Sequence, residues 1–369
     1  MNNNKVFPIK VLHTEWSDGW GGQEIRILNE MLAVRERGID VSLACREHAT
    51  IRKKAQQEGI PVYTFPFRGN TDLRTLGGLV RLIRRERIDI VNTHSGKDTW
   101  VGGLAAKLAG AKFIRTRHLS NPINPSRLNF INSLADFIIT TGESVREEMI
   151  RSNRIDPEKI LSVPTGVDAE RFSPDCCTKH EARSRLQIET DRFVIGNLAV
   201  LRGFKRHDLL IEAFESVHAL HPDTLLLIAG EGPQHPALEE LIREKNLQDS
   251  VRLLGHTEAP KSFLRALDLF VLSSDSKEGV PQSLIQALMM GLPCIATDVG
   301  SVRDLYTGEN FLLIEPGSAE AISKAILQLL SNSNQKEMYA NNASKNLEKF
   351  TQSYMADEIV EIYHTLLES

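Results

Sequence analysis

The chain has few cysteines and no long apolar run, which excludes several classes of protein. The four cysteines lack the two-residue spacing of a zinc knuckle or a redox pair, so we expect free thiols in a reducing compartment; they are Cys45, Cys176, Cys177 and Cys294. No apolar run approaches the length of a membrane span, and Met1–Lys5 lacks the basic and then apolar pattern of a signal peptide. We therefore expect a cytoplasmic protein.

Three motifs of phosphate and acyl chemistry are also missing from the sequence. No Asp-x-Asp pair offers an anchor for a divalent metal, no phosphate-binding loop of the nucleotide-hydrolase kind occurs, and no serine stands in a nucleophile elbow. We expect no metal site, and any phosphate group must then be bound by basic side chains and helix ends.

The net charge of −4 is divided unevenly along the chain. Residues 1–172 carry 26 lysines and arginines against 20 acidic residues, a net +6, and the remainder carries a net −10. The basic residues are densest at Arg74, Arg81, Arg84, Arg85 and Arg87. Two interpretations stay open: a solvated helix face, or contact with an anionic membrane surface, where each basic residue contributes roughly 1 kcal/mol.

Short β-branched runs alternate with amphipathic helices throughout, the pattern of parallel α/β units. In the first half we expect helices at 23–37, 73–85 and 99–108, and strands at 9–12, 41–45, 62–65, 88–93, 112–115, 137–140 and 160–163. In the second half we expect strands at 193–198, 224–229, 251–254, 269–272 and 293–296.

The alternation is interrupted between Asp168 and Thr190, which predicts a domain boundary. We expect an N-terminal acceptor-binding domain over 1–172, a linker over 173–190, and a C-terminal donor-binding domain over 191–349. A helix over 350–369 should pack back across the junction. The predicted fold is α/β, with two Rossmann-like doubly wound domains facing each other across a cleft, where ligands bind outside the carboxyl ends of the strands.

Loops at these strand ends carry the candidate phosphate-binding groups. Gly21 and Gly22 follow the first strand and let the backbone approach a ligand, although a plain tight turn is the alternative. Arg202 and Lys205 follow the first strand of the second half, where two cations suit a diphosphate, although surface ion pairs are the favoured alternative when these two residues are taken alone. Arg206 should point away from them.

The segment from Glu278 to Gly291 is the most informative one. Pro281 at a first helical position and Gly291 after the end bracket a short helix, whose positive end can meet phosphate. Glu278, just before it, can accept hydrogen bonds from sugar hydroxyls. The remaining candidates in this segment offer backbone N–H groups or a polar helix face; they are Gly279, Val280, Gln282, Ser283 and Gln286. Pro281 is part of the same segment but has no N–H.

Two further groups of residues complete the candidate site. His118 can donate to a sugar hydroxyl or a leaving oxygen. For His94 a structural role is equally open, and His13 should be structural. We expect base recognition in the loops at 230–233 and 255–257, which contain Gly230, Glu231, Gly255 and His256.

These motifs together resemble glycosyltransferase family 4, the retaining, metal-independent group with the GT-B fold. The resemblance runs from Gly21-Gly22 through Pro164-Thr165-Gly166-Val167-Asp168 and Ala229-Gly230-Glu231-Gly232-Pro233 to Thr297-Asp298-Val299-Gly300-Ser301. It implies that Glu278 contacts the donor sugar, that Arg202 and Lys205 hold the donor phosphates, and that His118 lies near the reacting sugar. Gly22 should lie near the donor phosphate.

One departure from the family pattern concerns the ribose. The second glutamate of the family's Glu-x7-Glu signature is here Gln286, which keeps one acceptor but loses the charge-assisted hydrogen bond. We expect Gln286 still to hold the ribose hydroxyls.

The resemblance implies a retaining hexosyl- or glycosyltransferase. Its donor is a UDP- or GDP-type sugar, and it needs neither cofactor nor metal. Its acceptor is a glycan or a lipid-linked acceptor in bacterial surface polysaccharide or lipopolysaccharide synthesis. The expected partners are these substrates and the inner face of an anionic membrane, but not nucleic acid. Two alternatives remain: a nucleotide-sugar epimerase or phosphorylase on the same fold, and a non-catalytic sugar-nucleotide-binding protein.

Overall fold

The computed structural model describes residues 8–118, 130–174, 177–189, 191–276 and 278–368. By internal contacts the chain forms two compact units. The first unit contains residues 1–166 and 349–369, and the second contains residues 167–348. The first boundary therefore lies six residues before the predicted one. Cys176 is outside the described residues, and the other three cysteines are free.

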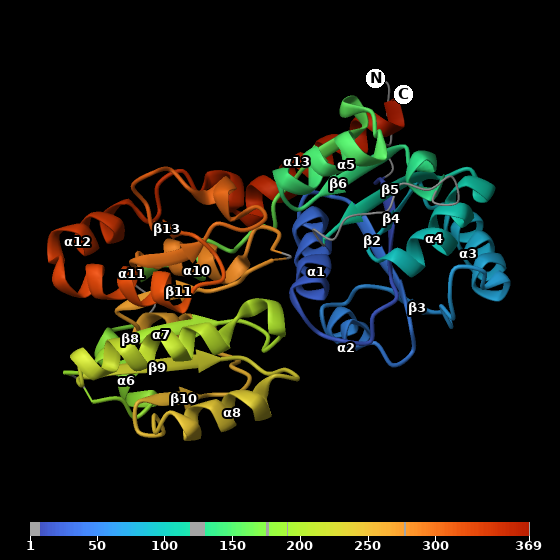
Figure 1. The fold of residues 1–369 in the computed structure, drawn as a ribbon. Helices are drawn as coiled ribbons and strands as arrows, with labels where there is room; N and C mark the ends of the chain where they lie inside the picture. The colour runs from blue at the N-terminus through green and yellow to red at the C-terminus, as the bar shows by residue number, and fades with distance from the viewer. Residues whose placement is uncertain (1–7, 119–129, 175–176, 190, 277, 369) are drawn as a thin grey trace. The chain divides into compact units, whose positions relative to one another are not determined.

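A seven-stranded parallel sheet forms the centre of the first unit, in the order β3-β2-β1-β4-β5-β6-β7 (Figure 1). Its strands are β1 (Lys10–Glu15), β2 (Asp40–Cys45), β3 (Val62–Thr64), β4 (Ile90–Thr93), β5 (Lys112–Arg117), β6 (Phe137–Thr140) and β7 (Ile160–Ser162). Its helices are α1 (Gly22–Arg35), α2 (Thr50–Gln57), α3 (Leu73–Glu86), α4 (Gly96–Ala109), α5 (Glu143–Asn153) and α13 (Gln352–Glu368).

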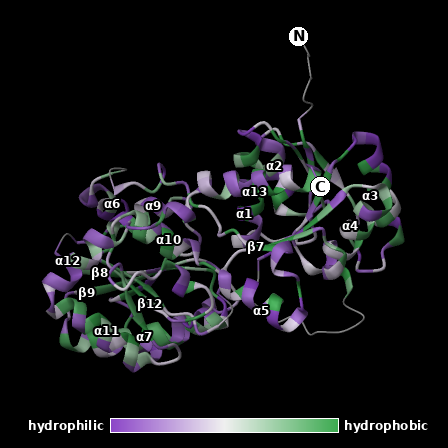
Figure 2. Cartoon of the chain, turned by 90° about the horizontal axis from the view of Figure 1, so that it is seen from above, coloured by the Kyte–Doolittle hydropathy of each residue, from purple (hydrophilic) through white to green (hydrophobic). Residues whose placement is uncertain are grey.

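Helices cover both faces of this sheet, which explains why its strands are apolar without strict alternation. Val11 of β1 faces the core beneath α1, α2 and α13, whereas its neighbour Leu12 faces the core beneath α3 and α4. Burial of both faces makes the sheet a rigid support for the loops that leave its strands. In each unit, hydrophobic residues are concentrated on the strands and hydrophilic residues on the outer faces of the helices (Figure 2).

The second unit has a six-stranded parallel sheet in the order β10-β9-β8-β11-β12-β13. Its strands are β8 (Phe193–Leu198), β9 (Thr224–Ala229), β10 (Val251–Leu253), β11 (Leu269–Leu272), β12 (Cys294–Thr297) and β13 (Leu312–Ile314). Its helices are α6 (Lys179–Arg185), α7 (His207–Leu220), α8 (His235–Glu244), α9 (Pro260–Ala266), α10 (Gln282–Met289), α11 (Ala319–Ser331) and α12 (Ser333–Asn342). The prediction of two doubly wound α/β domains is confirmed.

The structure differs from the sequence-based expectation in two places, β13 and the linker. β13 (Leu312–Ile314) was not predicted. Part of the predicted linker folds as α6, which packs against α9 within the second unit. The C-terminal helix α13 belongs to the first unit, where it packs against α1. The chain thus enters the second unit once and returns to complete the first.

Among the described residues, the structure contains no helix that is both long and apolar enough to span a lipid bilayer.

Candidate functional site

The strand order of the second unit reverses between β8 and β11, and the predicted phosphate-binding residues lie there. β9 and β10 extend the sheet on one side of β8, whereas β11, β12 and β13 extend it on the other. Arg202 and Lys205 follow β8, and Glu278 follows β11. Ligands of open α/β sheets bind at such a switch point, outside the carboxyl ends of the strands.

Lys205 and Glu278 form a largely buried ion pair at this point, with the Lys205 side chain 16% exposed. The Nζ atom of Lys205 lies 2.5 Å from Oε1 of Glu278, and Glu278 is only 5% exposed. The hydroxyl of Ser274 donates to the same carboxylate oxygen, and Ser273 Oγ donates to the Lys205 carbonyl at 2.8 Å. These contacts fix both charged side chains, although they are 73 residues apart in the sequence.

Glycine brings the loop after β12 against the backbone of Glu278. Gly300 has a φ of +54°, and a Cβ at this position would lie 2.0 Å from the Glu278 carbonyl oxygen. A similar approach occurs between the loops after β9 and β8, since a Cβ on Gly230 would lie 1.8 Å from the Ala199 carbonyl oxygen. Both glycines therefore allow a closeness of backbone that no other residue permits.

The helix after Glu278 begins one residue later than predicted. Pro281 is the capping residue, and α10 runs from Gln282 to Met289. Gln282, Ser283 and Gln286 are half-buried. The predicted polar face of the helix is therefore accessible to a ligand.

Other predicted residues of the second unit are more exposed. Arg202 is exposed beside the buried pair. In the base-recognition loops, Glu231 and His256 are exposed, and the N–H of Gly230 donates to the Gly255 carbonyl at 2.8 Å. Gly279 is half-buried, and Val280 and Pro281 are buried.

Arg206, the neighbour of Lys205, has other acidic partners. Its guanidinium pairs with Asp208 at 2.9 Å and with Asp275 at 3.0 Å. The adjacent His207 is buried, and its Nε2 lies 3.1 Å from Oδ1 of Asn197. Burial, with a smaller effect of Lys205, lowers the pKa of His207 to about 4.

The first unit has its own switch point between β1 and β4. Gly22 is the first residue of α1, and the preceding Gly21 N–H donates to the Glu24 carboxylate at 2.8 Å. The predicted glycine turn is thus a helix start at the carboxyl edge of the sheet. Glu15 ends β1, and burial together with Asp98 raises its pKa to about 8.

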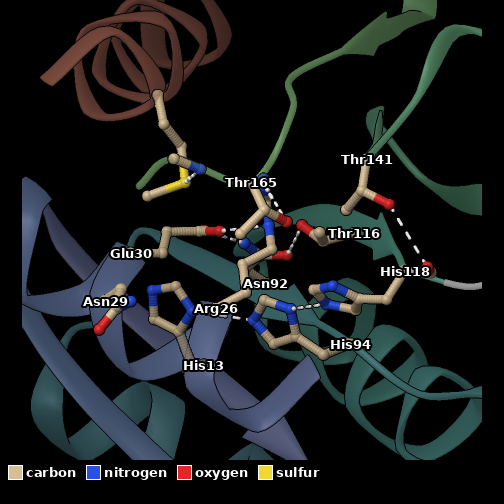
Figure 3. A network of polar contacts seen from close by, with 12 residues as sticks. His13, Arg26, Asn29, Glu30, Asn92, His94, Thr116, His118, Thr141 and Thr165 are labelled. Atoms are coloured by element: carbon tan, nitrogen blue, oxygen red, sulfur yellow. Dashed lines mark hydrogen bonds and ion pairs between the residues drawn. The ribbon is translucent and has the colours of Figure 1, made fainter. Parts of the chain in front are cut away.

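Three histidines form a continuous contact chain at this edge (Figure 3). Nδ1 of His13 lies 2.9 Å from Nε2 of His94, and Nδ1 of His94 lies 3.0 Å from Nε2 of His118. His13 is on β1, His94 follows β4 and His118 follows β5. The structure therefore joins the predicted candidate His118 to two histidines that sequence reasoning treated separately.

Burial keeps these three rings neutral. It lowers the pKa of His13 to about 3, and it lowers the pKa values of His94 and His118 well below their usual range. The positive charge of Arg26 adds to this effect on His94 and His118. A neutral imidazole has one N–H donor and one acceptor nitrogen, so each contact fixes the role of both rings.

A buried Arg26–Glu30 pair beside the histidines was missed in the sequence. The two residues lie four apart on α1, with Arg26 Nε 3.6 Å from Glu30 Oε2. Asn92 of β4 donates to Glu30 at 3.0 Å, and Thr116 donates to Asn92 at 2.8 Å. Burial raises the pKa of Glu30 to about 7 against the opposing effect of Arg26. An i,i+4 pair of opposite charges usually indicates a solvated helix face, so the sequence held no signal for burial.

The same cluster contains one group of residues of metal-ligating types. His13, Glu30 and His94 bring ligand atoms within 4.8 Å of one another. However, His94 uses both ring nitrogens to contact the other histidines, and the Arg26 guanidinium faces Glu30. We therefore interpret the cluster as a hydrogen-bond network rather than a cation site.

Comparison with protein families gives two matches that follow each other along the chain. Residues 20–171 match the family model described as Glycosyltransferase Family 4, and residues 178–346 match the one described as Glycosyl transferases group 1. The chain is 26% identical to the UDP-Gal:alpha-D-GlcNAc-diphosphoundecaprenol alpha-1,3-galactosyltransferase of Escherichia coli, over 96% of each sequence.

Solved structures show the same fold at lower sequence identity. A glycosyltransferase from Rickettsia africae has a TM-score of 0.88 and 21% identity, covering 98% of this chain and 99% of its own. HepE of Anabaena in complex with UDP has a TM-score of 0.85 and 19% identity, covering 97% of this chain and all of its own. Both have the two-domain GT-B arrangement of parallel α/β sheets.

Proposed function

The chain belongs to glycosyltransferase family 4, and from that premise we propose that it transfers a hexosyl group from a UDP-sugar to a lipid-linked glycan acceptor. We further propose that transfer retains the anomeric configuration and needs no metal ion. The product would be an intermediate of a bacterial surface polysaccharide or lipopolysaccharide.

One observation carries the proposal: the Lys205–Glu278 pair at the switch point of the second unit. A cation fixed at the carboxyl end of a parallel sheet suits a diphosphate. Among the described residues, the hydrogen bonds from Lys205 and Ser274 both reach Oε1 of Glu278, and we propose that Oε2 accepts a hydrogen bond from a sugar hydroxyl. Arg202 and the N–H groups that begin α10 add positive potential in the same loops.

These groups suggest how the reaction proceeds. As the sugar–phosphate bond breaks, negative charge develops on the departing diphosphate, and the preorganised cations stabilise it without a metal ion. We propose that the departing phosphate takes the acceptor proton on the same face of the sugar, which gives retention. His118 would act from the first unit on a hydroxyl near the reacting carbon.

The choice of substrates rests on the relatives. The Escherichia coli relative is named for a UDP-galactose donor and a diphosphoundecaprenol-linked acceptor, and HepE was solved with UDP. We extend the UDP donor and the lipid-diphosphate acceptor to this chain as proposals.

The proposal is tested by transfer from UDP-galactose, UDP-glucose, UDP-N-acetylglucosamine and GDP-mannose to N-acetylglucosamine-diphosphoundecaprenol, with proton NMR of the product anomer. We expect UDP release that depends on acceptor and an α-linked product from an α-linked donor. Conversion of donor without acceptor would support an epimerase instead. UDP binding without turnover on any acceptor would support a non-catalytic protein.

Variants of Lys205 and Glu278 test whether this ion pair serves the transfer reaction. Lys205→Met and Glu278→Gln should each lower kcat by about 10²–10³-fold, the range for loss of one preorganised charge-stabilising group. Arg206→Met serves as the matched control, because this cation lies in the same loop but pairs with Asp208 and Asp275. Lys205→Met leaves the buried Glu278 carboxylate uncompensated and should lower stability. The Lys205→Met/Glu278→Gln double variant should regain stability but not activity, which separates the two effects.

We also propose that α3 meets an anionic membrane. Arg74, Arg81, Arg84 and Arg85 are exposed on this helix, and Leu73 at its start is 77% exposed. Cosedimentation with phosphatidylglycerol vesicles should exceed that with phosphatidylcholine and fall with salt. Arg81→Glu/Arg84→Glu should abolish it, whereas the charge-matched control Arg151→Glu/Arg171→Glu should not. Equal loss in both variants would contradict a specific surface.

A further inference from the structure

The three-histidine chain can hold only two arrangements of its protons. In each histidine–histidine contact one ring must donate and the other accept, and each neutral ring has a single N–H. Either every N–H points toward His13 and the interior, or every N–H points toward His118. In the first arrangement His118 carries its proton on Nε2 and presents Nδ1 as an acceptor. In the second it carries the proton on Nδ1 and presents a donor.

The inner end of the chain meets the Arg26–Glu30 pair. Nε2 of His13 and Oε2 of Glu30 are both buried and make no hydrogen bond among the described residues. A ring nitrogen of His13 and a carboxylate oxygen of Glu30 lie within 4.8 Å of each other, so the Glu30 carboxylate is the charged acceptor group next to the inner end of the chain. The other titratable group against Glu30 is Tyr363 of α13, which is fully buried.

We propose that the Glu30 carboxylate sets the direction of the N–H groups along the three-histidine chain of His13, His94 and His118, which we call the relay. His13 and His94 then act as positioning residues that hold His118 with its proton on Nε2. A carboxylate can only accept, and therefore it favours an N–H on Nε2 of His13. Nδ1 of His13 then accepts from His94, and Nδ1 of His94 accepts from His118. His118 thus presents its Nδ1 lone pair to a hydroxyl of the substrate, a consequence that rests on the proposed function.

Substitution of Glu30 by glutamine should reverse the relay, because neighbouring contacts fix the orientation of the new amide. Thr116 donates to Asn92 Oδ1, and Asn92 Nδ2 donates to Oε1 of Glu30. As long as Asn92 and Thr116 keep these roles, the introduced glutamine has its oxygen toward Asn92 and its NH2 group where Oε2 of Glu30 stood. An acceptor at the inner end of the relay becomes a donor, with little change in shape.

The test is long-range ¹H–¹⁵N NMR of histidine-labelled protein at pH 8.5, where Glu30 is ionised, with His118 assigned from His118→Gln. We expect the proton of His118 on Nε2 in the wild type and on Nδ1 in Glu30→Gln. His207, buried in the second unit, is the internal control and should not change. The same His118 tautomer in both proteins would overturn the proposal.

Two further variants test the chain of contacts, and His13→Asn does so without depending on how Glu30→Gln folds. The amide of Asn matches Nδ1 of imidazole, so His94→Asn keeps the contact with His118 but breaks the one with His13. In that background Glu30→Gln should leave the His118 signals unchanged, and a persisting shift would overturn the relay. His13→Asn removes Nε2 and separates the relay from Glu30, so both tautomers of His118 should appear; a single unchanged tautomer would count against the proposal.

Activity measurements separate this inference from the proposed function. Glu30→Gln should lower kcat for transfer by ~10-fold or more, because a substrate hydroxyl then meets a donor instead of an acceptor. UDP affinity should be unchanged, since the charged groups proposed to bind UDP, Arg202, Lys205 and Glu278, lie in the second unit. If Glu30→Gln moves the proton while His118→Gln transfers sugar at the wild-type rate, the relay stands and the proposed role of His118 fails. If the proton does not move, the relay fails whatever the activity.

Discussion

Replacement of Gly300 by alanine tests the backbone geometry that holds Glu278. The new Cβ would lie 2.0 Å from the Glu278 carbonyl oxygen, whereas ordinary contacts of this kind begin at 3.4 Å. The loop at residue 300 and the segment around Glu278 must therefore move apart by about 1.4 Å. A displacement of about 1 Å at a reacting group can lower the rate by about 100-fold.

A matched control separates this displacement from simple backbone strain. Gly308 also has a positive φ, +92°, but a Cβ there would meet nothing within 4 Å. Both alanine variants should lose about 1–2 kcal/mol of stability from the left-handed conformation. Only Gly300→Ala should also lose activity.

The assay is steady-state transfer at saturating acceptor, together with thermal unfolding of the same preparations. We expect kcat/KM to fall about 100-fold in Gly300→Ala and to stay near the wild-type value in Gly308→Ala. Equal kcat/KM in the two variants would refute the reasoning, because the close approach to Glu278 would then have no consequence for the reaction.

Three other predictions concern the ribose contact of Gln286, the need for a metal ion, and the pH dependence of stability. Gln286→Glu should tighten UDP binding about fivefold by calorimetry, because a charge-assisted hydrogen bond to ribose is about 1 kcal/mol stronger than a neutral one; unchanged affinity would mean that residue 286 does not contact the ribose. EDTA should leave the transfer rate unchanged, and loss that Mg²⁺ restores would contradict a metal-independent reaction. Burial lowers the pKa of His207 to about 4. Below pH 6.5 this histidine therefore binds a proton in the unfolded state but not in the folded state. The free energy of unfolding should then fall toward pH 4 by up to about 1.4 kcal/mol per pH unit from this residue. His207→Gln, which keeps a donor toward Asn197, should show a shallower decline in urea unfolding between pH 6.5 and 5 than the exposed control His256→Gln.

Local sequence was sufficient for most strands and helices of this chain. Runs such as Phe193–Leu198 and Thr224–Ala229 form strands with the predicted limits, because apolar residues buried on both faces leave a continuous signal. The predicted starts of helices agreed less well with the structure. α4 begins at Gly96 rather than Thr99, because Ser95 and Asp98 form a capping box that extends the helix by almost one turn.

The candidate residues of the second unit could also be read from the sequence, but their partners could not. Glu278 and Lys205 were placed in loops at the ends of β11 and β8, since a parallel sheet brings such loops to one edge. That the two side chains form an ion pair depends on the strand order, in which β8 and β11 are neighbours although β9 and β10 lie between them in sequence.

The sequence by itself determined the two α/β units, the family and the loops that carry charge, because these follow from short-range periodicity and from motifs of fixed spacing. Only the tertiary structure decided which charges are buried together. Arg26 and Glu30 look like a surface pair in the sequence, yet α13 packs over α1 and helps to exclude water from them. His13, His94 and His118 come from three strands, and their contacts exist because β1, β4 and β5 lie side by side in the folded sheet.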